Sequence, residues 1–214
     1  MLPTPDLSHL TYQDYRNVYE PAEDTFLLLD SLEEDQEYIK KLKPKICLEI
    51  GSGSGCVITF LGQIVGNNSI YLTTDINPEA AKITQRTGKQ NKVKIDAINT
   101  DLTNGLLPRL KNSVDIICFN PPYVVTESSD INSSLIAASW AGGVDGREVT
   151  DRVLPLIPKL LSPGGSFYLL LIQENKPQEI VDIMETKYNL KYKLIKKRRA
   201  GIEQQYVLKF TKQL

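Results

Sequence analysis

The tetrapeptide Asn120-Pro121-Pro122-Tyr123 combines residue types that can hold a planar –NH2 group. Proline has no backbone N–H, so the stretch is rich in carbonyl groups that can only accept hydrogen bonds. The Asn120 side-chain oxygen and the Pro121 carbonyl would form a pair of acceptors, and Tyr123 could stack on the planar group. With both protons held, the nitrogen lone pair has a fixed direction, and positive charge that develops on nitrogen during alkylation is stabilised. We predict that Asn120, Pro121 and Tyr123 are catalytic and that they bind the substrate together with Pro122.

This chemistry does not require a general base, and the sequence offers no usable histidine. The single histidine, His9, lies in a polar stretch without a cluster of Cys or carboxylate residues around it. A Ser-His-Asp triad and a His-based metal site are therefore excluded by counting, and we predict no metal site. The three cysteines (Cys47, Cys56 and Cys118) each lie in an apolar run, which is typical of buried, reduced thiols. We expect a cytoplasmic protein, with the nucleus as a second compartment.

A glycine-rich turn, Gly51-Ser52-Gly53-Ser54-Gly55, follows a short apolar run and precedes an amphipathic stretch. Glycine lets the backbone turn tightly and lets a ligand approach the main chain. The spacing differs from the G-x-G-x-x-G of dinucleotide-binding folds, and a turn without a ligand is the alternative. The turn alone therefore does not identify a ligand.

Two acidic residues follow the next two predicted strands. Asp75 comes about 20 residues after the glycine turn, where a carboxylate can accept both hydroxyl protons of a ribose. Asp101 follows the third strand and could accept a hydrogen bond from an adenine amino group. Together with the turn, these strand ends favour a ligand that contains a nucleoside. Because Glu49, Asp75 and Asp101 would repel an anion, a cationic sulfonium cofactor fits better than a phosphate-bearing one.

Short apolar runs alternate with amphipathic stretches along the chain. The strands and helices that this pattern predicts must position the site residues named above. The predicted strands are 45–50, 69–74, 93–99, 113–119, 166–172, 190–196 and 206–211, and the predicted helices are 56–65, 78–90, 147–161 and 177–188. Such alternation predicts an α/β fold with a mostly parallel sheet and helices on both faces. The connection between the last two strands is too short for a parallel crossover, so one strand must be antiparallel. The irregular stretch 124–145 is expected to border the site.

The motifs at 49–55, 74–78, 100–102 and 120–123 resemble those of the class I S-adenosylmethionine-dependent methyltransferases of the HemK type. With the stretches 18–25 and 140–148, the chain is similar to the eukaryotic cytosolic branch. The resemblance implies a Rossmann-like class I methyltransferase fold with a seven-stranded, mostly parallel sheet and one antiparallel strand. It also implies an N-terminal segment, 1–44, that packs over the cofactor site and a methyltransferase domain, 45–214, the two together forming a single domain.

The same resemblance implies S-adenosyl-L-methionine as cofactor and assigns residues to it. Glu49, Gly51 and Gly53 would line its methionine and ribose region, and Asp75 would hold the ribose hydroxyls. The remaining predicted contacts are Asp101 and Leu102 with the adenine, Thr25 closing over the cofactor, and Asn120.

The methyl acceptor implied by the resemblance is the glutamine of the Gly-Gly-Gln motif in the class I translation termination (release) factor, methylated on N5. A small zinc-binding activator subunit would form a heterodimer with the chain through the edge strand 93–99. That strand is apolar at Val93 and Ile95 and has little protective charge, as expected for an edge that a partner covers.

Other functions remain as alternatives. Adenine also offers a planar amino group, so N6-adenine methylation of nucleic acid is one of them, and protein-lysine methylation is another. The basic run Lys196-Lys197-Arg198-Arg199 could contact nucleic acid, but it is more often a solvated strand end. Against nucleic acid stands the balance of 25 Lys and Arg against 26 Asp and Glu, a net charge of -1. An NAD-linked oxidoreductase or a scaffold without catalysis fits the motifs less well, and no apolar run approaches the ~18 residues of a membrane span.

Overall fold

The computed structural model describes residues 2–213 and contains a seven-stranded sheet with the strand order β3-β2-β1-β4-β5-β7-β6. Residues 1 and 214, the outermost residues of the two predicted segments, lie outside the described part. The strands are β1 (Ile46–Ile50), β2 (Ile70–Asp75), β3 (Ile95–Asn99), β4 (Val114–Phe119), β5 (Leu161–Ile172), β6 (Leu190–Ala200) and β7 (Glu203–Lys212). β7 runs antiparallel to both of its neighbours, whereas the pairs among β1 to β5 are parallel. The predicted α/β class with one antiparallel strand is confirmed.

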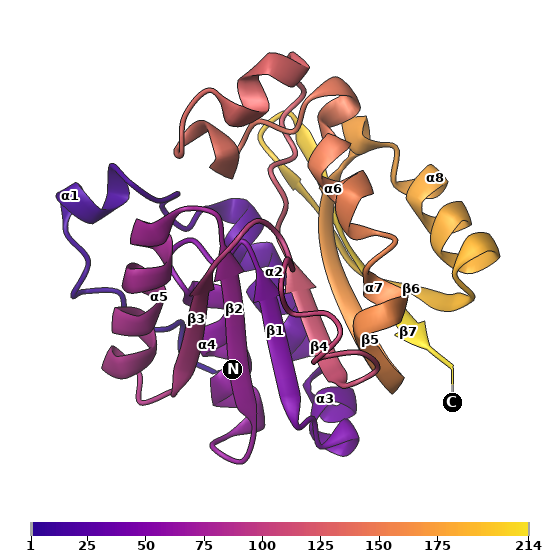
Figure 1. Cartoon of the computed structure of the whole chain (residues 1–214), viewed down its shortest axis with the longest axis horizontal. Helices are drawn as coiled ribbons and strands as arrows, with labels where there is room; N and C mark the ends of the chain where they lie inside the picture. Colours follow the sequence, from indigo (N-terminus) through magenta and orange to yellow (C-terminus); the bar gives the residue numbers. More distant parts are fainter. Residues whose placement is uncertain (1, 214) are drawn as a thin grey trace.

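Helices cover both faces of this sheet (Figure 1). They are α1 (Tyr12–Tyr15), α2 (Glu23–Glu34), α3 (Gln36–Leu42), α4 (Cys56–Val65), α5 (Pro78–Gln90), α6 (Glu148–Val153), α7 (Ile157–Leu160) and α8 (Pro177–Asp182). On one face, residues of α2, α3 and α4 pack with Cys47 and Ile116 of the sheet. On the other face, residues of α6, α7 and α8 pack with Leu48 and Ile117. Neighbouring strand residues thus face opposite helical layers, which explains the nearly continuous apolar runs.

The prediction of one helix over 147–161 is wrong. The chain forms α6 and α7 with a break at 154–156, because Pro155 has no N–H for the helical ladder. β5 then begins at Leu161, which pairs with Val114, so the Pro163-Gly164-Gly165 stretch belongs to the strand. The predicted helix 177–188 is α8 followed by a π-helical segment, η5 (Ile183–Lys187). β3 begins two residues later than expected.

The N-terminal helices, to which the sequence analysis assigns no bounds, are anchored by a buried ion pair. Asp35, between α2 and α3, accepts hydrogen bonds from Lys209 Nζ at 2.5 Å and Tyr168 Oη at 2.7 Å. Lys209 Nζ also lies 3.6 Å from the centre of the Tyr38 ring. A buried carboxylate needs such partners, so the pair fixes where α2 sits against β5 and β7. This matters for the site, because α2 carries residues that line it.

The segment between β4 and α6 rises above the carboxyl ends of the parallel strands (Figure 1). It contains three short 3-10 helices, η1 (Ser128–Asn132), η2 (Ala137–Ser139) and η3 (Val144–Gly146), while a fourth, η4 (Gln173–Asn175), follows β5. A bridge between Val124 and Ala141 closes its base. Among the described helices, none is long and apolar enough to cross a membrane.

Candidate active site

A cavity lies at the carboxyl ends of β1, β2 and β4, with about 950 Å³ of empty space including the part open to solvent. Its walls contain every residue predicted to contact a cofactor: Thr25, Glu49, Gly51, Gly53, Asp75, Asp101, Leu102 and Asn120. We call it the first cavity. The structure thus brings these side chains together, while their roles in binding stay predictions.

The glycine turn between β1 and α4 forms the floor of the first cavity. All three of its glycines have positive φ angles, which L side chains rarely adopt. A Cβ at Gly55 would lie 2.9 Å from the Thr84 Cα of α5, whereas a Cβ at Gly53 would meet nothing within 4 Å. Gly55 is therefore needed for packing against α5, and Gly53 leaves open space beside the cavity.

Asp75, at the end of β2, supports this turn from within the cavity. Its Oδ2 accepts a hydrogen bond from Gly53 N at 2.9 Å, and its Oδ1 accepts one from Asn77 N at 2.9 Å. A carboxylate has about four acceptor sites, so each oxygen keeps one for a ligand hydroxyl. Burial raises the pKa of Asp75 despite these two hydrogen bonds. The residue is thus both a brace for the turn and the expected ribose contact.

Glu49 adds a second buried carboxyl group to the first cavity. It is 3% exposed, and its Oε2 accepts a hydrogen bond from Ile58 N in α4 at 3.0 Å. Burial raises the pKa of Glu49 well above its usual value, and the nearby Asp75 adds to the shift. A positively charged ligand would favour the ionised form of both acids. The two buried carboxyl groups, Glu49 and Asp75, therefore fit a cationic sulfonium cofactor.

Asp101 lies at the rim of the first cavity, where its Oδ2 accepts a hydrogen bond from Arg152 Nη2 of α6. Nothing in the local sequence of Asp101 indicates this ion pair, because Arg152 lies 51 positions away. The ion pair leaves Asp101 Oδ1 for an adenine amino group. Leu102 follows with a positive φ of 50°, as the chain turns along the cavity wall.

Asn120, at the end of β4, forms part of the first cavity and of a second cavity beside it. Its Nδ2 donates to Asp24 Oδ2 at 3.0 Å. Its Oδ1 is buried and has no hydrogen-bond partner among residues 2–213. Buried acceptors without a donor are rare, because the missing hydrogen bond costs free energy. This oxygen is therefore available to a donor from a substrate.

The second cavity contains three of the four predicted substrate-binding residues, Asn120, Pro121 and Tyr123. Pro122 lines the first cavity instead. The rest of the second cavity comes from distant parts of the chain, including Tyr19, Trp140 and Glu203. The two cavities share Tyr19, Asn120 and Ser139 in their walls, so they meet beside Asn120, as expected if one holds a methyl donor and the other a methyl acceptor.

Asp24, at the start of α2, is the site residue that the sequence analysis missed. It is 3% exposed and accepts hydrogen bonds from Tyr123 Oη at 3.2 Å and Tyr19 Oη at 3.3 Å, besides that from Asn120. Its Oδ1 also accepts from Thr25 N at 2.7 Å. Burial and the Asp24 charge raise the pKa values of Tyr19 and Tyr123, so both hydroxyls stay protonated. Asp24 lies in the stretch 18–25 that carries the family resemblance, which is the signal that could have found it.

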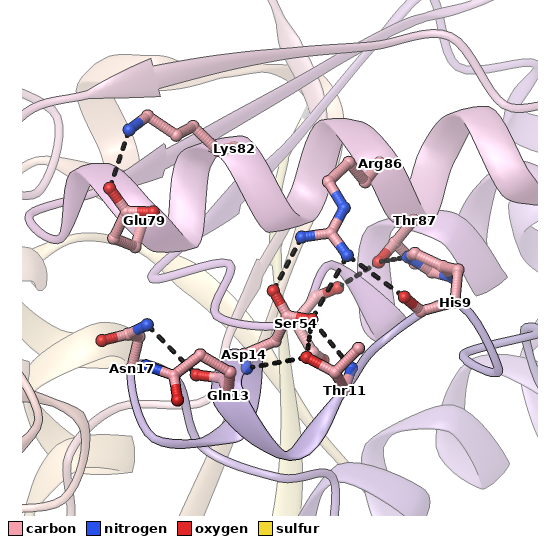
Figure 2. Close-up of polar contacts among 10 residues, drawn as sticks. All are labelled: His9, Thr11, Gln13, Asp14, Asn17, Ser54, Glu79, Lys82, Arg86 and Thr87. Atoms are coloured by element: carbon pink, nitrogen blue, oxygen red, sulfur yellow. Dashed lines mark hydrogen bonds and ion pairs between the residues drawn. The ribbon is translucent and has the colours of Figure 1, made fainter.

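Residues 6–18 form a strap that crosses α5 and ends at the first cavity, where Asn17 and Val18 line the wall. Arg86 of α5 pairs with Asp14 of the strap at 2.7 Å, and Figure 2 shows the two side chains facing each other. Thr87, one residue further, donates to Ser54 O of the glycine turn at 2.7 Å and contacts the His9 ring at 3.3 Å (Figure 2). The only histidine of the sequence therefore joins the strap to α5.

Basic side chains of the run 196–199 form ion pairs and a ring contact with other residues of the chain. Lys196 and Arg198 pair with Glu34 and Asp30 of α2, and Lys197 Nζ lies 4.9 Å from the centre of the Tyr206 ring. This favours the interpretation as a strand end over a nucleic-acid patch.

Within the described part of the chain, no group of His, Cys, Asp and Glu could hold a metal ion. All three cysteines are free and buried, which confirms that prediction.

Comparisons with known proteins agree on the kind of enzyme. Residues 22–142 match the family model "Methyltransferase small domain". The chain is 53% identical over 209 residues to the human protein named Methyltransferase HEMK2, covering 98% of this chain and 96% of that protein. It is 37% identical over 223 residues to the Schizosaccharomyces pombe eRF1 methyltransferase catalytic subunit mtq2, covering 98% and 95%.

A solved structure supports the same grouping. The structure of the E. cuniculi Mtq2-Trm112 complex, described as responsible for methylation of the eRF1 translation termination factor, contains a chain that is 30% identical. The match has a TM-score of 0.66 and covers 92% of this chain and 99% of that one. From its motifs, its fold and these relatives, the chain belongs to the methyltransferase small domain family and, within it, to the HemK-type methyltransferases.

Proposed function

We propose that this enzyme methylates N5 of the glutamine in the Gly-Gly-Gln motif of the eukaryotic class I translation termination factor, with S-adenosyl-L-methionine as methyl donor. The observation that carries the proposal is the buried, unpartnered Oδ1 of Asn120 at the meeting point of the two cavities. The relative named eRF1 methyltransferase catalytic subunit covers nearly all of this chain, which supports the acceptor.

The first cavity would hold the methyl donor. When bound, S-adenosyl-L-methionine supplies a methyl group on a positively charged sulfur. Asp75 and Asp101 would accept hydrogen bonds from its ribose hydroxyls and its adenine amino group, while Glu49 contributes a buried carboxyl group nearby. Gly53 leaves room for close approach to the main chain. The hydrogen bond from Gly53 N to Asp75 Oδ2 joins the glycine turn to Asp75, so this wall is formed before the ligand arrives.

The second cavity would hold the glutamine side chain. Asn120 Oδ1 and the Pro121 carbonyl would each accept one proton of the amide –NH2 group. When the amide nitrogen takes the methyl group, it would gain positive charge, which the two oxygens would stabilise. The nitrogen would then lose one of its protons to water, which leaves a neutral N-methyl amide. Because Asn120 is fixed by Asp24, the acceptor oxygen does not have to reorient during the reaction.

The structure favours an amide over the alternative acceptors. N6-adenine methylation of nucleic acid would benefit from a free basic surface, and three of the four residues in the run 196–199, Lys196, Lys197 and Arg198, are paired or stacked within the chain. A lysine ammonium must lose a proton before it can be methylated. An amide is already neutral and offers the two protons that the predicted acceptor pair would hold. Both alternatives remain outcomes of the experiment below.

For the partner, we propose a small zinc-binding activator that pairs with β3. This strand lies at the edge of the sheet, as predicted, and beside it Ile70 and Ile76 are 51% and 44% exposed. The solved relative is a complex with Trm112. An edge strand with exposed apolar neighbours is a site for strand addition.

For the compartment, we propose the cytoplasm, with the nucleus as a second place.

The test uses labelled S-adenosyl-L-methionine, the purified chain with its candidate activator, and the termination factor. Mass spectrometry should locate one methyl group on the Gly-Gly-Gln glutamine, and the factor with Gln replaced by Asn at that position should stay unlabelled. Label on a lysine, or on the adenine of an added RNA or DNA, would reassign the acceptor. No transfer to any acceptor with the activator present would contradict the proposal.

A further inference from the structure

Asp24 accepts hydrogen bonds from several parts of the chain, and besides a longer one from Thr25 Oγ1 at 3.4 Å there are four others. They are Asn120 Nδ2 at 3.0 Å, Tyr123 Oη at 3.2 Å, Tyr19 Oη at 3.3 Å and the backbone N–H of Thr25 at 2.7 Å. The first two donate to Oδ2 and the last two to Oδ1. An ionised carboxylate is a pure acceptor, and hydrogen bonds to it are stronger than those to neutral groups. Asp24 therefore dictates the orientation of any donor–acceptor side chain beside it.

The side chain of Asn120 is such a group, because one end of its carboxamide donates and the other end accepts. The carboxylate of Asp24 attracts the –NH2 end and repels the oxygen end. The oxygen is thereby turned toward the meeting point of the two cavities, where no other described residue hydrogen-bonds with it. With the opposite orientation, the site would present a donor to the substrate amide and could not hold its protons.

Building on the proposed role of Asn120, we infer that Asp24 is a positioning residue, which selects the productive orientation of the Asn120 carboxamide while it also holds the Tyr123 hydroxyl. A second function of Asp24, as contact of the methyl donor, is not supported, because Asp24 lines the second cavity and not the first. The inference thus predicts an effect on turnover without an effect on donor affinity.

The variant Asp24→Asn tests this with a side chain of the same shape. Thr25 N and Tyr19 Oη both donate to Oδ1, so the new amide should keep its oxygen there and place its –NH2 group at the Oδ2 position. Two –NH2 groups would then face each other, and Asn120 would turn over, with its nitrogen toward the substrate. We expect kcat to fall at least tenfold, with an upper bound near the roughly 10²–10³-fold loss that follows removal of one oxyanion-hole hydrogen-bond donor. The Kd of S-adenosyl-L-methionine, measured by calorimetry, should stay within twofold.

The exchanged pair Asp24→Asn with Asn120→Asp gives the decisive comparison. The amide at position 24 can donate to one oxygen of the new carboxylate, whose other oxygen again faces the substrate as an acceptor. The total charge is unchanged. We expect this double variant to be at least tenfold more active than Asp24→Asn alone, and more active than Asn120→Asp alone, in which two carboxylates oppose each other. A role in packing or in net charge alone would give no such rescue.

Asp30→Asn is the matched control, since Asp30 lies on the same helix and pairs with Arg198 away from both cavities. Its kcat should equal that of the unaltered chain. If Asp24→Asn does not fold, as judged by thermal unfolding, Asp24→Ser replaces it, because its hydroxyl is too short to reach Asn120. The inference is overturned if the position 24 variant loses less than tenfold in kcat, or if the exchanged pair is no more active than Asp24→Asn. By contrast, full activity of Asn120→Ala would overturn the proposed function itself.

Discussion

The two cavities that meet at Asn120 are built in different ways. In the first, the polar groups come from successive strand ends, and they are braced by backbone N–H groups nearby, as Asp75 is by Gly53 and Asn77. In the second, the key side chains come from positions 19, 24, 120 and 123, and they depend on hydrogen bonds between separate elements. Substitutions in the first cavity should therefore act one at a time on affinity, whereas those in the second should act together on turnover.

The largest effect is expected for Asn120→Ala, which removes an acceptor at the meeting point. We expect kcat to fall by about 10²–10³-fold, because the developing charge on nitrogen loses one of its two stabilising oxygens. Donor affinity should change by less than threefold. Single-turnover kinetics with calorimetry of donor binding measure both quantities. A loss that appeared only in donor affinity would contradict the assignment of donor binding to the first cavity and of turnover to the second.

Asp75→Ala should have the next largest effect and the opposite signature. The variant loses the expected hydrogen bonds to the ribose and leaves Gly53 N and Asn77 N without their acceptor. Hydrogen bonds to a charged group contribute about 1.5–3 kcal/mol, so the donor Kd should rise roughly 10- to 100-fold. At saturating donor, kcat should remain within about threefold of the unaltered value. Calorimetry and donor-saturated rates check the two parts, and unchanged donor affinity would remove Asp75 from the donor site.

Glu49 should make the stability of the ligand-free chain depend on pH. Burial raises its pKa above the value of 4.5 that an exposed glutamate has, so the folded state binds the proton more tightly than the unfolded state. The contribution is fully present below pH 4.5 and is lost as the pH rises toward the higher pKa of the folded state. Glu49→Gln should therefore gain stability relative to the unaltered chain as the pH rises. Urea unfolding of both proteins from pH 5 to 8 measures this, and parallel pH profiles would contradict it.

The smallest effect concerns the strap. Asp14→Asn weakens the ion pair with Arg86 that ties the strap to α5. Exposed ion pairs contribute about 0.2–1 kcal/mol, so donor affinity should fall by no more than about fivefold, through the rim residues Asn17 and Val18. Glu79→Gln, which weakens an ion pair with Lys82 on the same helix, is the control and should change nothing. Equal affinities for both variants would mean that the strap does not support the first cavity.

The same contrast explains what could be predicted from the sequence. The first cavity follows from local signals, such as the glycine turn and the Asn77-Pro78 start of α5, where Asn77 Oδ1 indeed accepts from Glu79 N at 3.0 Å. Each of these signals can be recognised from a few consecutive residues, without knowledge of contacts to distant parts of the chain. The seven strands were predicted for the same reason, because alternation of apolar runs and helices is visible without knowledge of contacts.

What could not be predicted depends on contacts between distant residues. Asp24 and Asn120 are 96 positions apart, and nothing in the local sequence of either residue indicates the other. The pair of Asp101 with Arg152 spans 51 positions. Pro155 is a local signal for a helix break, but the apolar periodicity of 147–161 continues across it and predicts one helix. Hydrogen-bond pairing between elements, rather than the elements themselves, is the part that requires the structure.

The edge position of β3 has a consequence for the amount of usable enzyme in a cell. An uncovered strand can pair with the activator, but it can also pair with a second copy of itself, which is the first step toward aggregation. The two processes compete for one row of backbone groups. The abundance of the activator relative to this chain would then limit how much enzyme accumulates, and overproduction of the catalytic chain alone would yield precipitate rather than additional methylation.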